Sequence, residues 1–462
     1  NRLFRNVSAG ENKGLAGRRF EDVTGRAGVG GPGGWPANLA GEFATHQPPL
    51  SWSTSTSFLD YDGDGKLDLF VCSYLTWSPG IDLKQLFTLN GRDRAYGPPV
   101  AFEGAQNLLY RNRGDGTFED VSAKAGVQVF QRVGSDSEKG IHNVAKSMGC
   151  IVADVDQDGW PDIIVANDTV RNFFFHNVAG PDGSRRYEEI GTESGIAYAE
   201  GNARGAMGID FAPNIRPGMH ALIIGNFADE PNTYLCHEDG AGLLFTDRAL
   251  AEGIAGPSRR LLKFGALFFD FDLDGRQDLL TCNGHLEPEI KTLQTGQQYA
   301  QPPQLFWNTG KSPRGFEPVP EKVAGPDLFK PLVGRGCAYA DLDGDGDLDI
   351  ILIGNGGPAR VLRNEGGTGN HWLRLKLVGN GKTSNTSAIG ARITLEAGGI
   401  TQTREIASAR GYLSASELTA TFGLGKIAKI DKITIRWPGK QAGSPQVLTD
   451  LAIDKEHTIQ QP

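Results

Sequence analysis

The sequence has little of what marks several large protein classes. It has only 3 Met and 5 Cys among 462 residues, and no CxxCH motif, which argues against covalently attached c-type haem. No stretch approaches the roughly 18 consecutive apolar residues of a membrane helix, so we predict no membrane span. The net charge is −9 and Lys/Arg runs are lacking, so a nucleic-acid partner is not favoured.

Glycine is the abundant residue instead. Its 63 copies are about twice the usual ~7% share. Asn/Asp-Gly turns interrupt the chain every few residues, which argues against a large helical bundle. The chain begins at Asn1 with neither Met nor an apolar leader, which indicates a removed signal peptide or a truncated N-terminus; we expect the former.

Two phrases recur along the chain. The first is an apolar strand, an Asp-rich loop and a second strand, found at 57–73, 149–168, 266–284 and 336–355. A degenerate copy at 208–226 keeps only Asp210 of the acidic pattern. The second phrase, as in LYRNRGDGTFEDV, supplies two more short strands after each copy and also opens the chain. Units of about four strands predict an all-β propeller of five to seven blades over residues 1–365, closed by pairing N- and C-terminal strands.

The repeats stop near residue 365, and a Gly-rich linker follows at 365–370. Beyond it the periodicity is that of short alternating strands. We predict them at 371–378, 391–396, 401–406, 419–422, 432–437 and 457–460. About 90 residues of this pattern predict a small β-sandwich-like domain over residues 371–462.

Four loops match D-x-D-x-D-G-x-x-D, and they are the candidate metal sites. Their aspartates are Asp60, Asp62, Asp64 and Asp68; Asp154, Asp156, Asp158 and Asp162; Asp270, Asp272, Asp274 and Asp278; and Asp341, Asp343, Asp345 and Asp349. The Gly after the third Asp allows a sharp turn, so that the carboxylates converge and repel one another unless a cation lies among them. Hard oxygen ligands in a flexible loop favour Ca²⁺, and we predict about four Ca²⁺ sites. The backbone carbonyl of the seventh loop residue is a further expected ligand: Lys66, Trp160, Arg276 and Asp347.

An EF-hand loop begins in the same way but needs an acidic ligand at position 12. That position holds Val71, Val165, Thr281 and Leu352, within apolar strands, so the EF-hand reading fails in all four loops. Plain solvated Asp-Gly turns are the other alternative. Without the 16 loop aspartates the chain would carry a net charge of +7, so bound calcium would neutralise much of its acidity. Because the loops are repeated and use protein ligands, we interpret the sites as structural.

These residues resemble a known family. The DxDxDGxxD loops followed by LYRNRGDGTFEDV resemble FG-GAP/VCBS repeats, which also form integrin α-subunit propellers. The segments IGARITLEAGG (389–399), TREIASARGYLSASE (403–417), FGLGK (422–426) and ITIRWPGK (433–440) resemble the ASPIC/UnbV domain. Together they are similar to the cartilage-acidic-protein-1-like group, which is mostly secreted. The resemblance implies surface binding or scaffolding in an extracellular or cell-surface location and names no ligand.

Two functions from different classes remain open. The first is a calcium-stabilised extracellular scaffold that mediates adhesion to a protein or a glycan, or assembles with itself into an oligomer or filament. The alternative is a polysaccharide lyase or hydrolase, which needs a cleft with paired carboxylates or a Lys/Arg/His cluster. We find no convincing catalytic set outside the metal loops, so we favour a non-enzymatic role.

Cysteine and histidine receive structural interpretations. Cys72, Cys150, Cys236, Cys282 and Cys337 are read as small buried residues, with blade-to-blade disulfides as the alternative. His142, His176 and His285 are read as loop residues that cap turns rather than as zinc or acid–base groups.

Overall fold

The computed structural model describes residues 2–8, 18–31, 49–132, 141–366, 369–440 and 443–462. Short strands joined by turns dominate this part of the chain, as the glycine content predicts. Its helices are single turns: α1 (Thr24–Ala27), α2 (Pro79–Asp82), η2 (Pro99–Ala101), α3 (Ala255–Ser258), α4 (Ile290–Leu293) and α5 (Glu321–Ala324). None of the helices in these ranges is long or apolar enough to cross a lipid bilayer.

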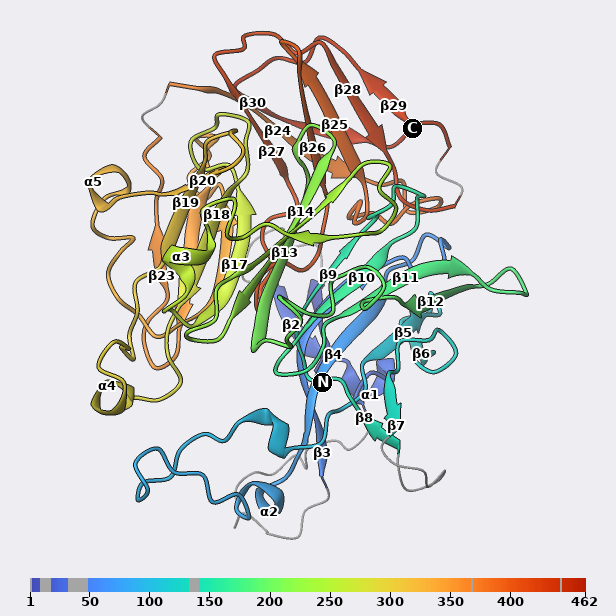
Figure 1. The fold of residues 1–462 in the computed structure, drawn as a ribbon. Coiled ribbons are helices and arrows are strands. Elements are labelled where there is room, and N and C mark those ends of the chain that lie inside the picture. Colours follow the sequence, from blue (N-terminus) through green and yellow to red (C-terminus); the bar gives the residue numbers. More distant parts are fainter. Residues whose placement is uncertain (1, 9–17, 32–48, 133–140, 367–368, 441–442) are drawn as a thin grey trace.

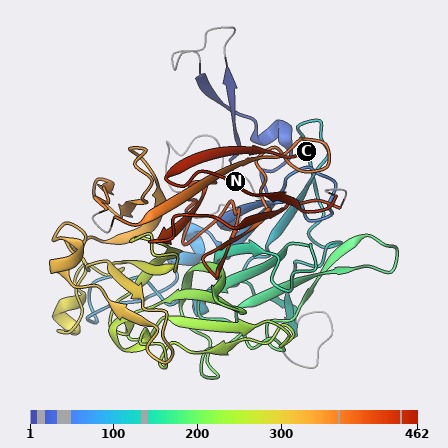
Figure 2. The ribbon, with the colours of Figure 1, turned by 90° about the horizontal axis from the view of Figure 1, so that it is seen from above.

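Five antiparallel sheets, one for each repeated unit, are arranged around a common centre (Figures 1 and 2). They are β3 (Leu50–Leu59), β4 (Asp68–Trp77), β5 (Leu108–Asn112) and β6 (Phe118–Asp120); β9 (Ser147–Ala153), β10 (Asp162–Asn167), β11 (Phe173–Ala179) and β12 (Arg185–Glu189); β13 (Ala206–Arg216), β14 (Met219–Asn226), β15 (Thr233–Glu238) and β16 (Thr246–Asp247); β17 (Lys263–Phe269), β18 (Asp278–Asn283), β19 (Gln304–Asn308) and β20 (Phe316–Pro318); and β21 (Gly334–Ala340), β22 (Asp349–Gly354) and β23 (Arg360–Leu362). Within each sheet the strands follow chain order, and the first strands of successive sheets contact one another. The predicted β-propeller fold is therefore confirmed, with five blades in the described residues.

Apolar side chains on both faces of each sheet pack between neighbouring blades. Phe70 and Leu109 of the first blade share one cluster with Ile163 and Phe175 of the second. Comparable clusters join the second blade to the third, the third to the fourth and the fourth to the fifth. Because both faces are covered, β10 and β14 are buried along their whole length, which explains their nearly continuous apolar sequences. All five cysteines are buried free thiols within these layers, which agrees with the small-residue interpretation.

Among the residues that the structure describes, no sheet is shared between the two ends of the repeats, so the predicted closure by strand pairing is wrong. β1 (Phe4–Ser8) and β2 (Arg18–Asp22) pair with each other in a separate sheet, as do β7 (Phe130–Arg132) and β8 (Ile141–Asn143). Val23, Ala27 and Val29, which follow β2, pack on the face of the first blade that is turned away from the second. The physical reason lies in β23, which already occupies the third-strand position in the fifth blade.

The C-terminal residues form two further sheets that share one hydrophobic core (Figure 1). One contains β24 (His371–Val378), β27 (Ala420–Gly425) and β30 (Lys455–Gln460); the other contains β25 (Arg392–Ala397), β26 (Ile400–Glu405), β28 (Lys432–Arg436) and β29 (Gln446–Leu448). The six predicted strands are all present, and only the short β29 was missed. A domain boundary between residues 365 and 371 stays a prediction, and residues 367–368 lie outside the described part.

Residues 406–419, here named the central segment, leave the C-terminal sheets and enter the middle of the propeller. Gly411 exchanges two backbone hydrogen bonds with Ile209 on β13, at 2.9 and 3.2 Å. A Cβ at Gly411 would lie 3.4 Å from the carbonyl oxygen of Ala266 on β17 and 3.8 Å from that of Cys337 on β21. A φ of +70° at this point favours glycine for its backbone conformation.

The central segment also connects the first and fifth blades. Ser408 Oγ donates to the carbonyl of Phe58 (2.9 Å) and accepts from its N–H (2.8 Å) on β3. At the other end, Ser416 Oγ accepts from the N–H of Tyr339 (3.2 Å) on β21. The two ends of the blade series are thus joined by a C-terminal segment rather than by a shared sheet.

Candidate metal centres

Each Asp-rich loop connects the first and second strands of a blade, at the end of the propeller that faces the C-terminal sheets. A Cβ at Gly65 would lie 3.1 Å from the carbonyl oxygen of Lys382, and one at Gly275 equally close to that of Gly423. The predicted sharp turn is present, since Gly65, Gly159, Gly275 and Gly346 have φ values between +85° and +100°. The first, second, fourth and fifth blades carry these loops.

The third blade has a tight hairpin where the other blades have an Asp-rich loop. The alignment of its sequence with the repeat pattern therefore needs a correction. Asp210 was aligned with the acidic pattern, but it lies inside β13 opposite Ile223. In three other blades the first loop aspartate follows an inner-strand glycine by five residues, as Asp154 follows Gly149. The same count from Gly208 reaches Pro213. The third blade therefore has none of the predicted ligands.

The same hydrogen bonds recur in all four loops. In the first loop Gly65 N–H donates to Asp60 (2.9 Å), while Tyr61 and Asn112 N–H donate to the two oxygens of Asp68 (3.1 and 2.8 Å). The equivalent donors in the other loops are Gly159, Val155 and Asn177; Gly275, Phe271 and Asn308; and Gly346, Leu342 and Asn364. The Asn of the second sequence phrase thus orients the last aspartate of each loop.

Three loops bring carboxylate oxygens from positions 1, 3 and 9 within 4.8 Å of one another. These sets are Asp60, Asp62 and Asp68; Asp270, Asp272 and Asp278; and Asp341, Asp343 and Asp349. In the second loop the close set is Asp156, Asp158 and His176. Buried oxygens Asp62 Oδ1 and Asp154 Oδ1 have no hydrogen-bond partner, which fits a cation that would complete their coordination.

Predicted ligands at positions 5 and 7 are placed differently. In the first and third loops the fifth-position aspartate pairs with the basic side chain at position 7: Asp64 with Lys66 (2.7 Å), and Asp274 with Arg276. In the second loop the Trp160 ring lies under Arg185 instead. The position-12 residues lie in β4, β10, β18 and β22, as the argument against an EF-hand requires. Metal binding by the seventh-residue carbonyls stays a prediction.

Crowding of buried carboxyl groups has a clear electrostatic effect. Burial, reinforced by Asp64 and Asp62, raises the pKa of Asp60 to about 6. Burial and Glu405 raise the pKa of Asp154 to about 7, and burial and Asp274 raise that of Asp270 to about 8. A divalent cation would favour the ionised forms and reverse these shifts.

These shifts predict an unusual pH dependence for the metal-free protein. The folded-state pKa values exceed the ordinary value of about 3.9, so the folded state binds more protons between pH 4 and 8. Its stability should therefore fall as pH rises through 6 to 8, because deprotonation costs more in the folded state. Thermal melts after exhaustive chelation should give a higher Tm at pH 5 than at pH 8, and a saturating cation should remove this order. A metal-free Tm that rises from pH 5 to 8 would contradict the prediction.

Sequence reasoning missed several residues beside the loops. His176 lies within β11 and its Nε2 is 3.0 Å from Asp156, and His142 lies within β8, so neither is a loop residue. Arg111 and Arg363, at the position in their blades equivalent to His176, pair with Asp62 (2.7 Å) and Asp343 (3.5 Å). His285 does cap a turn, accepting from Glu287 N–H at 3.1 Å, and burial lowers its pKa to about 4.

Two glutamates at the ends of the central segment also touch the loops. Glu405 accepts from the N–H of Asp154 at 3.0 Å, and Glu417 accepts from that of Asp341 at 3.4 Å. Arg374 on β24 joins the latter site, with Nε 3.2 Å from Asp341 and two bonds to Glu417 at 2.7 and 2.8 Å. The sequence could have indicated these two glutamates, because Glu405 and Glu417 are the only acidic residues of TREIASARGYLSASE.

Comparisons with known proteins agree with this arrangement. The FG-GAP-like repeat model matches residues 270–352, which include two of the Asp loops, and the ASPIC and UnbV model matches residues 381–462. Cartilage acidic protein 1 of Homo sapiens is 25% identical over 423 residues, covering 88% of this chain and 55% of that protein. The chain is a homologue of cartilage acidic protein 1. The Xenopus tropicalis homologue is 26% identical over 83% of this chain and 51% of its own length, so the chain spans about half of these relatives.

Similar solved structures are more distant. An Agrocybe aegerita lectin that recognises non-reducing terminal N-acetylglucosamine covers 79% of this chain and 80% of its own at 14% identity, with a TM-score of 0.33. A Bombyx mori GH32 β-fructofuranosidase covers 88% of this chain and 89% of its own at 10% identity, with a TM-score of 0.28. Such TM-scores support no functional argument, and the propeller assignment rests on strand order and repeats. Cartilage acidic protein 1 is not named for an enzymatic activity.

Proposed function

We propose that the protein is a secreted, calcium-stabilised scaffold that mediates adhesion or assembly through protein or glycan contacts. One observation carries the proposal: four equivalent loops hold crowded carboxylates, some with unpartnered buried oxygens, at the face between the propeller and the C-terminal sheets. Homology to cartilage acidic protein 1 supports an extracellular setting.

Calcium is the cation that best suits these residues. The aspartates at positions 1, 3 and 9 would hold it in three loops, and Asp156 and Asp158 with neighbouring Asp154 would hold it in the second. The bound ion would supply charge neutralisation and a clamp between loop segments. Oxygen-only sites of extracellular modules bind at roughly 10⁻⁴–10⁻³ M, which suits a calcium-rich exterior.

A binding role is favoured over catalysis by how the propeller centre is used. Gly411 and its neighbours occupy the centre, where they bond to β3, β13 and β21. A polysaccharide would have to displace this segment to reach a central site. The lyase or hydrolase alternative therefore receives no support.

Calcium content tests the proposal directly. We expect about four equivalents per chain after equilibration with calcium and gel filtration, measured by elemental analysis. Asp343→Asn should lose one equivalent, because it removes a charged ligand from one loop. The control is Asp327→Asn. It alters an exposed aspartate that belongs to none of the Asp loops and pairs with Lys330, so this variant should lose no calcium. A calcium content near zero would refute the proposal.

A further inference from the structure

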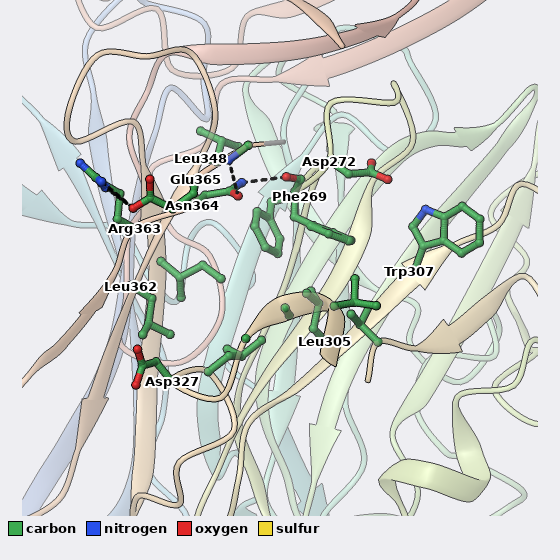
Figure 3. A pocket seen from close by; sticks show the side chains of 18 of the residues that line it. Phe269, Asp272, Leu305, Trp307, Asp327, Leu348, Leu362, Arg363, Asn364 and Glu365 are labelled. Carbon is green, nitrogen blue, oxygen red and sulfur yellow. Dashed lines mark hydrogen bonds and ion pairs between the residues drawn. The ribbon is translucent and has the colours of Figure 1, made fainter. Parts of the chain in front are cut away.

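A pocket with both apolar and charged lining residues lies between the fourth and fifth blades beside strand β23. It has a volume of about 890 Å³ and is lined by Phe269, Leu305, Trp307, Leu348, Val361 and Leu362, among others. Figure 3 shows Phe269 and Leu305 on one side and Leu362 on the other. Val361 of β23 is 58% exposed, although it lies in the third-strand position of a blade.

Complete blades show what fills this place. In the first, second and fourth blades, an aromatic residue of the fourth strand lies opposite an Asn of the third strand: Phe118 opposite Asn112, Tyr187 opposite Asn177, and Phe316 opposite Asn308. The aromatic ring then packs on the preceding blade. Tyr187 lies 6.4 Å from Tyr61, and Phe316 lies 5.4 Å from Tyr234, between ring centroids.

The fifth blade has the third strand and the Asn but, in the described residues, no fourth strand. Asn364 N–H donates to Asp349, as Asn308 N–H does to Asp278. Leu305 of the fourth blade, in the position that Tyr234 has in the third, lines the pocket. The pocket is therefore the place where the aromatic residue of a fourth strand would pack.

One described segment of the chain has the matching sequence but lies outside the blades, paired with β1 so that Phe20 is opposite Asn6, as Phe118 is opposite Asn112. Phe20-Glu21-Asp22-Val23 repeats Phe118-Glu119-Asp120-Val121, which forms the fourth strand of the first blade. Phe20 is 73% exposed in β2, whereas Tyr187 and Phe316 are buried. In the first blade Glu119 lies opposite Arg111. The same register would set Glu21 opposite Arg363, so the charges would be complementary.

We propose that β2 of a second copy of this chain exchanges its pairing with β1 for the free edge of β23. In the register that it has with β1, it would place Phe20 opposite Asn364 and insert its ring into the pocket. Within one chain, the β1–β2 hairpin is attached to the first blade and not to the pocket, because Val23, Ala27 and Val29, which follow β2, are buried against that blade. Hairpin and pocket are different surfaces, so the contact is head-to-tail and builds a ring or an open chain of subunits, according to the rotation between neighbouring copies. The inference deepens the assembly role proposed above and rests on it.

Self-association of the full chain in calcium tests the inference. Sedimentation velocity should show concentration-dependent oligomers, and Phe20→Ala should weaken the association about tenfold or more, since it removes a buried aromatic anchor. Phe130→Ala is the matched control, because Phe130 is also exposed, at 54%, but lies on β7. Wild-type protein that stays monomeric, or oligomers that Phe20→Ala leaves intact, would overturn the inference.

Disulfide cross-linking identifies which segment occupies the pocket beside β23. Glu21→Cys and Arg363→Cys proteins, mixed under mild oxidation, should form a disulfide-linked heterodimer that reduction dissolves; the native thiols are buried. If the double variant instead cross-links within one chain, the second-copy assignment is wrong. Calcium content separates the two proposals: a monomer with four calcium equivalents overturns only this one, and Phe20-dependent oligomers without calcium overturn only the calcium role.

Discussion

Replacing Arg410 with Met should lower the free energy of unfolding by about 3–5 kcal/mol, because the change strands a buried carboxylate. Arg410 donates to Asp210 at 2.8 Å and to the carbonyl of Glu405 at 3.2 Å. Asp210 is 1% exposed, and its other hydrogen bonds come from the N–H groups of Phe268 (2.8 Å) and Phe211 (2.9 Å). Without the guanidinium, the charge at the centre of the propeller would lose its only counter-ion among these partners.

Urea unfolding and thermal melts measure this effect, with an expected fall in Tm of roughly 3–5 °C for a chain of this size. Arg186→Met is the control: Arg186 also pairs with a carboxylate, Glu188, but both side chains are nearly half exposed. An exposed pair contributes at most about 1 kcal/mol. Adding Asp210→Asn to Arg410→Met should recover part of the loss, because it removes the unpaired charge. Equal destabilisation by Arg186→Met and Arg410→Met would contradict the argument.

Local chemistry explains why so much of the fold could be predicted. Each Asp loop contains its own turn glycine and is flanked by its own strands, so the loop at 341–349 needs no distant residue to adopt its shape. The C-terminal strands alternate in the same local way, and the predicted 371–378 strand coincides with β24. The repeat itself predicted the propeller fold, because each unit can bury its faces only against similar units.

What could not be predicted depends on contacts distant in the sequence. Ring closure failed as a prediction because RLFRN (2–6), which overlaps β1, and RVLRN (360–364), which contains β23, fit the same position. Only the folded packing decides between them. Asp210 looked like a remnant of a loop because strand register is invisible in a single motif. The central segment was quoted for its family resemblance, but no local pattern shows that Gly411 meets Ile209 about two hundred residues earlier.

Removing calcium should have the largest effect of all, because the loops lie where the C-terminal sheets contact the propeller. At 10 mM calcium and the affinity given above, each site would contribute about 1.4–2.7 kcal/mol. Four sites together would then contribute about 5–11 kcal/mol, a Tm difference of roughly 5–11 °C between calcium and chelator for a chain of this length. Magnesium is the control cation, since it demands a tighter octahedral site and should restore little.

The same experiment should show where the structure loosens first. Asp154 and Asp341 bond to Glu405 and Glu417, so calcium on these two loops would hold both ends of the central segment. Loss of the ion leaves crowded carboxylates that repel one another and weakens these anchors. Trypsin should then cut after Arg410 in chelator and spare it in calcium, when the fragments are read by mass spectrometry below the Tm of either state. Cleavage that begins in the blades and leaves Arg410 protected would show that the loops stabilise each blade separately and do not retain the central segment.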